Sequence, residues 1–375
     1  MLLKKILANP IVKLMGLAIL TAIAVVSLNF GISSAIATPK PLRTLIAQTA
    51  SPSNNNIGNI FLKIFFGFDD YSPFLEGLAG VGDGNKWGYI DKQGNFKIAA
   101  KFDAISPFFE GLAAVSIADK WGFIDKKGNF KIQPKFDLAY PFLEGLSLVR
   151  VGEEWGYINK QGDFVFKPQF ENGLPFLEGM AAVQVNKKWG YVDKSGRTAI
   201  KPQFDSSSPF FEGLAAVSVN NRWGYINKQG DLTIKPQFEG TFLFLEGLAP
   251  VQVNNQWGYV DKSGNIVIKP QFDYAFGFVE GLAGVVAEGK WGYIDKTGNF
   301  VIKPQFDNAS VFSEGLAEVK VGEKWGYIDK SGKEVIPSKF ENNSFFSDGL
   351  AGVRINGKWG YIDRKGRIII KPQFE

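Results

Sequence analysis

The chain of 375 residues contains neither cysteine nor histidine. Without cysteine it forms no disulfide and has neither a thiolate metal ligand nor a cysteine for lipid attachment. Without histidine it lacks the commonest general base of enzymes and a frequent metal ligand. These absences argue against an enzyme and against a metal centre. We therefore predict no catalytic residue, no metal site and no cofactor.

Acidic residues are missing from the first 59 positions, which hold five basic residues, namely Lys4, Lys5, Lys13, Lys40 and Arg43. The formal net charge of +5 arises entirely there, because residues 60–375 hold 37 basic and 37 acidic residues. Binding to nucleic acid requires a basic surface that neutralises phosphates. The balanced charge of the longer part predicts no nucleic-acid partner.

The order of residues at the N-terminus is that of an export signal. Three lysines precede an uncharged run from Leu14 to Thr38, in which Ala35-Ile36-Ala37 resembles a cleavage site. We predict a signal peptide at 1–37 and a flexible linker at 38–59. The alternative is an uncleaved anchor, because the uncharged run is long enough to span a bilayer. Either way the repeats are expected outside the cytoplasm: periplasmic, secreted, on the cell surface, or anchored and facing outward.

Tryptophan recurs at a fixed spacing of 34 residues. Glycine follows each tryptophan, and Tyr or Phe stands two positions after it. All nine tryptophans of the chain obey this rule: Trp87, Trp121, Trp155, Trp189, Trp223, Trp257, Trp291, Trp325 and Trp359. A fixed period of this length is typical of repeat proteins. We predict nine tandem repeats over 60–375, with residues 60–69 as a partial capping repeat.

Each repeat reads as three short antiparallel strands joined by tight turns, a β-meander. In the repeat of Trp223, an apolar strand at 214–219 is followed by Asn220-Asn221, which favours a hairpin turn. The tryptophan strand and a turn ending in Gly230 come next, and residues 232–238 then alternate between apolar and polar. Proline recurs in this third strand, which predicts a sheet edge. Glycine after tryptophan predicts a close approach of backbone or ring.

With these residues in view, the chain resembles the bacterial WG repeat, or WG β-repeat, family. The motifs that carry the resemblance are E-G-L-A-x-V, K-W-G-Y-I-D-K-x-G and V-I-K-P-Q-F-D, which recur through residues 68–375. Local departures occur at Ala99-Ala100 and at Pro337-Ser338-Lys339. The resemblance implies tandem β repeats in bacterial, often exported, proteins that serve as interaction or binding scaffolds. It implies no particular ligand.

Two arrangements fit nine such repeats, an open solenoid-like array and a closed β-propeller. Residues 61–64 with Phe68-Asp69 align one period before 95–98 with Phe102-Asp103, as a surplus third strand. An open array uses such a strand as a terminal cap, and propellers usually have about four to eight blades. We therefore predict the open solenoid, with the closed propeller as the alternative.

The function predicted is that of an exported, non-catalytic scaffold that binds protein or peptide partners through the variable loops between repeats. The alternative is a module that binds carbohydrate or cell-wall glycan. Five loop aromatics that the repeat pattern does not require are the candidate binding residues: Tyr140, Phe242, Tyr274, Phe276 and Phe345. They could instead complete the core. The nine tryptophans are expected to form the structural core of the repeats, with ring stacking on a sugar or base as the alternative.

Acidic residues also recur in every repeat, in a Glu-Gly pair that becomes Asp348-Gly349 in the last one. They could be ligand or metal carboxylates. We predict instead that Glu246 and its equivalents accept hydrogen bonds from backbone N–H groups in tight bends.

Overall fold

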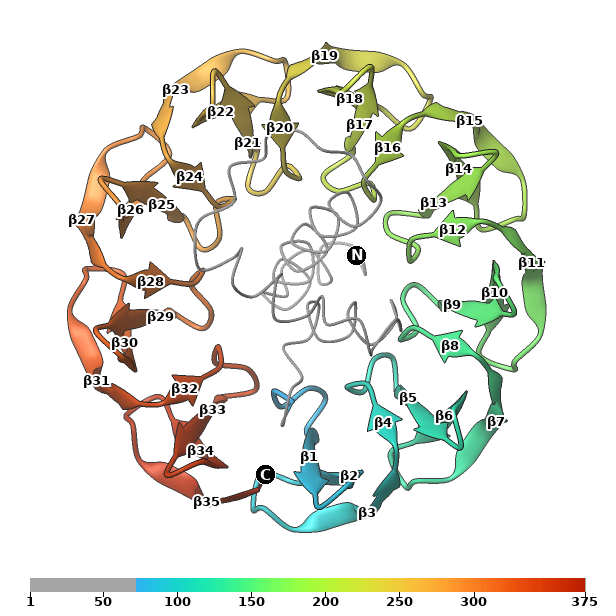
Figure 1. Cartoon of the computed structure of the whole chain (residues 1–375), viewed down its shortest axis with the longest axis vertical. Helices are drawn as coiled ribbons and strands as arrows, with labels where there is room; N and C mark the ends of the chain where they lie inside the picture. Colours follow the sequence, from blue (N-terminus) through green and yellow to red (C-terminus); the bar gives the residue numbers. More distant parts are fainter. Residues whose placement is uncertain (1–71, 375) are drawn as a thin grey trace.

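The computed structural model describes residues 72–374, which form a ring of nine antiparallel sheets (Figure 1). Each sheet contains consecutive strands in sequence order, so each is one blade of a β-propeller. Blade 1 consists of β1–β3, and blades 2 to 9 each take the next four strands, from β4–β7 to β32–β35. The all-β class and the nine repeats predicted from the sequence are confirmed.

In every blade the tryptophan strand lies between a strand of five or six residues on its inner side and a seven-residue strand on the perimeter (Figure 1). The tryptophan strands are β2 (Lys86–Ile90), β6 (Lys120–Asp125), β10 (Glu154–Asn159), β14 (Lys188–Asp193), β18 (Arg222–Ile226), β22 (Gln256–Asp261), β26 (Lys290–Ile294), β30 (Lys324–Asp329) and β34 (Lys358–Asp363). The strands on their inner side are β1 (Ala79–Asp83), β5 (Leu112–Ile117), β9 (Leu146–Val151), β13 (Met180–Val185), β17 (Ala215–Val219), β21 (Leu248–Val253), β25 (Ala283–Ala287), β29 (Leu316–Val321) and β33 (Leu350–Ile355).

The perimeter strands end each blade, as proline in the third strand predicts. They are β3 (Phe96–Phe102), β7 (Phe130–Phe136), β11 (Phe164–Phe170), β15 (Thr198–Phe204), β19 (Leu232–Phe238), β23 (Ile266–Phe272), β27 (Phe300–Phe306), β31 (Glu334–Phe340) and β35 (Ile368–Phe374). The two repeats that depart from the usual motif form the strands β3 and β31 of the same length as the others.

Blades 2 to 9 have a fourth strand that the sequence did not predict. Two residues of the variable connection pair with the next strand and form the innermost edge of the sheet. These strands are β4 (Ala104–Ile105), β8 (Leu138–Ala139), β12 (Asn172–Gly173), β16 (Ser206–Ser207), β20 (Gly240–Thr241), β24 (Tyr274–Ala275), β28 (Asn308–Ala309) and β32 (Asn342–Asn343). The connection that follows each of them points toward the centre of the ring (Figure 1).

The glycine after each tryptophan accommodates a bulge in the perimeter strand. In blade 6, Trp257 is opposite Phe272 and Tyr259 is opposite Ile268, so the perimeter strand has two extra residues between these pairs. A Cβ atom on Gly258 would lie 2.5 Å from the carbonyl oxygen of Ile268 and 2.6 Å from the nitrogen of Pro270. The predicted close approach is therefore confirmed, and it is an approach of backbone.

Neighbouring blades are joined by the hydroxyl of the tyrosine that follows Trp-Gly. In eight of the nine junctions between described blades it donates a hydrogen bond of 2.7–2.9 Å to a backbone carbonyl of the next blade. At the ninth junction Phe123 has no hydroxyl, and the carbonyl of Tyr140 accepts from the Oγ of Ser147 at 2.6 Å instead. Burial raises the pKa of six of these tyrosines, for example Tyr157 and Tyr191, so their hydroxyls stay protonated donors.

The recurring acidic residues form a second link between blades. The carboxylate of Glu246 accepts a hydrogen bond from the N–H of Gly281, in the corresponding turn of the next blade, at 3.0 Å. The same bond occurs at every junction, with the shorter of its distances between 2.9 and 3.2 Å. Lys296 of the next blade adds an ion pair with Glu246 and a bond to its carbonyl. The predicted acceptor role is confirmed, but the bonds run between repeats.

The predicted open solenoid is wrong, because blade 9 meets blade 1 through the contacts found at every other junction. Asp348 accepts from the N–H of Gly77 at 2.9 Å, and the Tyr361 hydroxyl donates to the carbonyl of Ser72 at 2.9 Å. A buried cluster that includes Phe74 draws on both blades. The solenoid was predicted from a surplus N-terminal strand at residues 61–69 and from the usual limit of about eight blades. That segment lies outside the described residues, and the described sheets form a ring of nine blades. Here each sheet is complete in itself, so the ring closes without exchanging strands.

The taper of each blade explains why nine repeats curve into a ring. In blade 2, Ala114 on β5 is opposite Phe123 on β6, and the same row continues to Ile132 on β7. In this row the side chain nearer the centre is smaller than the two farther out, and glycine or alanine holds the inner position in six of the nine blades. Stacked wedges rotate relative to one another, and a rotation of about 40° per repeat closes nine of them. Burial of both faces of the tryptophan strand is common to rings and rods, and does not distinguish them.

The predictions for the N-terminal part, namely the signal peptide at 1–37, the linker at 38–59 and the cap at 60–69, lie outside the described residues.

Ring closure predicts that Tyr361→Phe destabilises the protein as much as Tyr191→Phe does. Each change removes one buried hydrogen bond between blades and leaves a carbonyl without that donor, at a cost of about 1–2 kcal/mol. Denaturant unfolding of the two variants measures the effect. In an open array Ser72 would be far from Tyr361, so a neutral Tyr361→Phe beside a destabilising Tyr191→Phe would contradict the ring.

Candidate functional site

One position of the inner connection, immediately after the two-residue innermost strand, changes between serine and large side chains from blade to blade. Serine occupies it in five blades, where its Oγ accepts from a backbone N–H of the neighbouring strand at 2.5–3.3 Å. Larger apolar or aromatic residues replace serine in the other four blades, at Tyr140, Leu174, Phe242 and Phe276. The constant frame therefore presents a variable set of side chains on its inner connections.

Three of the five candidate binding residues lie together in blades 6 and 7. Phe242 stacks on Trp257 with ring centroids 5.0 Å apart and planes at 9°. Phe276 stacks on Trp291 at 4.7 Å and 23°. Tyr274 lies between the two pairs, with its centroid 5.5–6.0 Å from each of the other four rings. These five residues are called the aromatic cluster below.

The aromatic cluster is partly accessible. Trp257, Tyr274 and Trp291 are at most 5% exposed, whereas Phe242 and Phe276 are only half-buried. The two phenylalanines pack on a buried apolar layer, which comprises Phe211, Leu243, Leu245, Val279 and Val311. Packing on this layer holds the two phenylalanine rings in place, so their exposed surface forms a rigid aromatic patch.

A glycine makes room for part of this patch. A Cβ atom on Gly284 would lie 3.2 Å from Phe276 and 3.6 Å from Trp291. The equivalent residue in blade 6 is Pro250, which has no N–H group and therefore needs no serine acceptor. The loss of serine at Phe242 thus leaves no backbone donor unsatisfied there.

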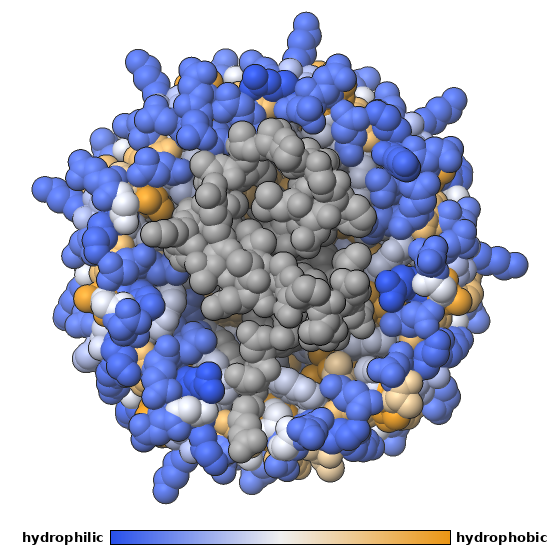
Figure 2. Space-filling model, in the orientation of Figure 1, coloured by the Kyte–Doolittle hydropathy of each residue, from blue (hydrophilic) through white to orange (hydrophobic). Residues whose placement is uncertain are grey.

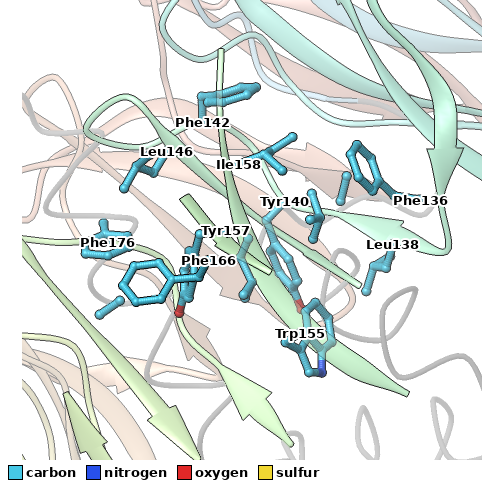
Figure 3. Packing of buried hydrophobic residues seen from close by; sticks show 14 of the residues in the cluster. Phe136, Leu138, Tyr140, Phe142, Leu146, Trp155, Tyr157, Ile158, Phe166 and Phe176 are labelled. Atoms are coloured by element: carbon cyan, nitrogen blue, oxygen red, sulfur yellow. The ribbon is translucent and has the colours of Figure 1, made fainter. Parts of the chain in front are cut away.

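The other two candidates lie elsewhere in the ring. Tyr140 in blade 3 is buried against Trp155, with centroids 5.6 Å apart, as Figure 3 shows. The guanidinium group of Arg150 lies over the same tryptophan ring at 5.8 Å. Phe345 is half-buried in blade 9, two blades away from the aromatic cluster.

The repeated tryptophans do not share one environment. Five are buried, namely Trp121, Trp155, Trp257, Trp291 and Trp359, and four are half-buried, namely Trp87, Trp189, Trp223 and Trp325. On the face of the ring drawn in Figure 2, hydrophilic residues dominate the outer part and apolar ones show as scattered patches.

Glu318 is a polar residue in an otherwise apolar series that sequence reasoning missed. It lies on β29 in blade 8, and the eight equivalent residues of the other blades are Gly80, Ala114, Leu148, Ala182, Ala216, Pro250, Gly284 and Gly352. Its Oε1 is buried and has no hydrogen-bond partner in the described chain. Burial raises the pKa of its carboxyl to about 7, and Ser310 partly opposes this effect. Aligning the repeats column by column reveals this exception.

Within residues 72–374, no group of three or more Asp and Glu side chains is placed to hold a metal ion. In the same part of the chain, no helix has the length and apolar character needed to cross a membrane.

The chain belongs to the family of the WG containing repeat. The family model matches ten successive segments, namely 64–87, 87–121, 121–155, 155–189, 189–223, 223–257, 257–291, 291–325, 325–359 and 359–375. These matches confirm the resemblance seen in the repeated motifs.

One solved structure shares the fold at low sequence identity, and a second shows a weaker similarity. A eukaryotic initiation factor is 14% identical, with a TM-score of 0.59 over 80% of this chain and 96% of that one. The WD40 domain of SCAP from fission yeast is 9% identical, with a TM-score of 0.38 over 78% of this chain and 93% of that one. A search of the curated proteins finds no match.

Replacing Glu318 by glutamine is expected to stabilise the protein at alkaline pH. A raised carboxyl pKa means that the folded state retains a proton which the unfolded state releases, so stability falls as pH rises from 4.5 to about 7 and is then constant with respect to this group. We expect Glu318→Gln to gain up to about 3 kcal/mol over the native protein at pH 8, and little at pH 5. Urea unfolding at both pH values measures this difference.

Glu323→Gln is the matched control, since the Glu323 side chain is 95% exposed in the same blade. Equal stability of native and Glu318→Gln proteins at both pH values would contradict the raised pKa.

Proposed function

We propose that this propeller is an exported, non-catalytic scaffold that binds a protein or peptide partner through the aromatic cluster of blades 6 and 7. The observation that carries the proposal is the contiguity of five aromatic rings, three from the variable connections and two from the tryptophan strands, with Phe242 and Phe276 half-buried above a buried apolar layer. Aromatic anchors held rigidly at partly buried positions contribute most of the binding free energy in many protein interfaces.

The recurring polar groups support a role without catalysis. The carboxylates of the Glu-Gly turns are already engaged with the N–H groups and lysines of the next blade. The tyrosine hydroxyls are buried and donate to backbone carbonyls. Both sets hold the ring together, and neither is left available as a general acid or base.

Carbohydrate is the second candidate ligand. Flat aromatic faces also stack on sugar rings, and the two stacked pairs of the aromatic cluster present such faces at Phe242 and Phe276. The uncharged character of these rings suits a neutral glycan as well as an apolar peptide side chain.

Export is proposed from the order of the N-terminal segment alone, namely basic residues, then an uncharged run, then Ala35-Ile36-Ala37. We expect the native protein to begin near Thr38 and to lie outside the cytoplasm. Mass spectrometry of the protein from its own cells, after fractionation, identifies the N-terminus. A cytoplasmic protein with Met1 in place would contradict export.

Replacing both Phe242 and Phe276 by serine is expected to weaken partner binding at least about tenfold while the fold persists. Both rings are half-buried, so their loss removes contact surface without emptying the core. Binding of full-length native and variant proteins to immobilised peptide and glycan arrays measures the effect, and it separates the two candidate ligands.

Phe300→Ser is the matched control, because Phe300 is 41% exposed on the perimeter strand of blade 7. The proposal fails if the double variant and Phe300→Ser bind the arrays as the native protein does.

A further inference from the structure

Glu318, in the blade next to the aromatic cluster, introduces a carboxylate whose Oε1 has no hydrogen-bond partner in the described chain. No lysine or arginine among residues 72–374 lies within ion-pair distance of it. Lys320, two residues along the same strand, is instead 3.7 Å from the carboxylate of Glu323. A buried carboxylate oxygen that lacks a donor lowers stability. The stability of the ring therefore does not explain why this position holds a glutamate.

The junction between blades 7 and 8 brings Glu318 close to Tyr293, which stands two residues after Trp291 of the aromatic cluster. Trp291 and Tyr293 are two residues apart on β26, so their side chains lie on the same face of the strand. The Tyr293 hydroxyl donates to the carbonyl of Ser310 in blade 8 at 2.7 Å. The Ser310 Oγ accepts from the N–H of Glu318 at 3.3 Å, and the charge of Glu318 adds to the raised pKa of Tyr293.

Blade 8 has two polar residues where blade 7 has phenylalanine and glycine. Phe276 lies beside Gly284 in blade 7, and the equivalent residues of blade 8 are Ser310 on the inner connection and Glu318 on β29. A carboxylate in blade 8 therefore follows the phenylalanines of blades 6 and 7 around the ring. Phe276 and Glu318 are both half-buried, so part of each side chain is exposed.

We propose that Glu318 binds a cationic group, an ammonium or guanidinium, whose apolar neighbour packs on Phe276. The partner inferred is thus a peptide segment with a basic side chain beside an apolar or aromatic one. This inference rests on the proposed function and specifies its ligand. A cation here gains an ion pair with Glu318 and the field of the nearby aromatic rings. It also gives the carboxylate the donor that its Oε1 lacks in the described chain.

The titration of Glu318 gives the site a pH dependence. Burial holds the pKa of the free carboxyl near 7, and a bound cation lowers it, so binding releases a proton around neutral pH. Affinity for a cation therefore rises between pH 6 and pH 8. The other titratable groups that face the site are Tyr293, Tyr327 opposite Glu318 on β30, and Lys320. The pKa of Tyr293 is raised well above its ordinary value, so this tyrosine remains neutral in that range.

Two small probes of the same shape test the inference on the full-length protein. Phenethylammonium carries an aromatic ring and a charge, whereas 2-phenylethanol carries the ring with a neutral hydroxyl. NMR titrations at pH 6 and pH 8 give the affinity of each probe for the native protein and for the variants Glu318→Gln, Glu323→Gln and Phe276→Ser. Glu323→Gln is the control for the loss of a carboxylate in the same blade.

At pH 8 we expect phenethylammonium to bind the native protein at least about tenfold more tightly than 2-phenylethanol. The preference should shrink at pH 6, vanish in Glu318→Gln and persist in Glu323→Gln. Phe276→Ser should weaken both probes. Equal affinity for the two probes, or a preference that survives in Glu318→Gln, would overturn the role of Glu318.

If both probes bind equally and Phe276→Ser weakens both, the aromatic cluster stands as a binding site and the cation inference fails alone. If neither probe binds the native protein, the cation inference is overturned, and the peptide and glycan arrays decide on the proposed function separately.

Discussion

The ring depends on a carboxylate that reaches from one blade to the next. Each Glu-Gly turn has left-handed backbone at both residues, as in Glu246 with φ of 54° and Gly247 with φ of 90°. This geometry turns the glutamate side chain toward the N–H of the corresponding glycine one repeat later. A glutamate in this backbone region is uncommon and costs free energy. The bond between blades, together with the lysine that joins it, offsets that strain.

Much of the repeat could be predicted from its residues, because the relevant forces are local. Turn-forming residues and alternating apolar positions identify the strands, and the proline of the third strand identifies the edge. The glycine after tryptophan, such as Gly258, indicates that another segment of backbone passes close to it. Closure could not be predicted in this way, since the angle between blades is a sum over side chains of slightly different size. The two-residue strands at the innermost edge, such as Ala104–Ile105, were missed because two residues are too few to show an alternating pattern.

The sequence indicated individual residues of the candidate site but not which of them come together. Phe242, Tyr274 and Phe276 stood out as aromatics that the repeat does not need, but only the ring brings them against Trp257 and Trp291. Tyr140 fits the same sequence criterion and lies buried in another blade. The sequence also distinguishes the blades of the aromatic cluster by the residue before the inner phenylalanine. Proline precedes the inner phenylalanine in blades 1 to 5, whereas Leu243, Gly277, Val311 and Phe345 replace it in blades 6 to 9.

The self-contained blades make the seam between the first and last repeats equivalent to any other junction. No strand of residues 72–374 crosses it, and Asp348 with Gly77 repeats there the bond that Glu246 makes with Gly281. The contacts between blades therefore do not depend on which junction separates the first repeat from the last, and a circular permutation at another junction would leave the described contacts unchanged. Diversity can accordingly accumulate in one sector, by substitution within single repeats, while the closure of the ring rests on the frame that all repeats share.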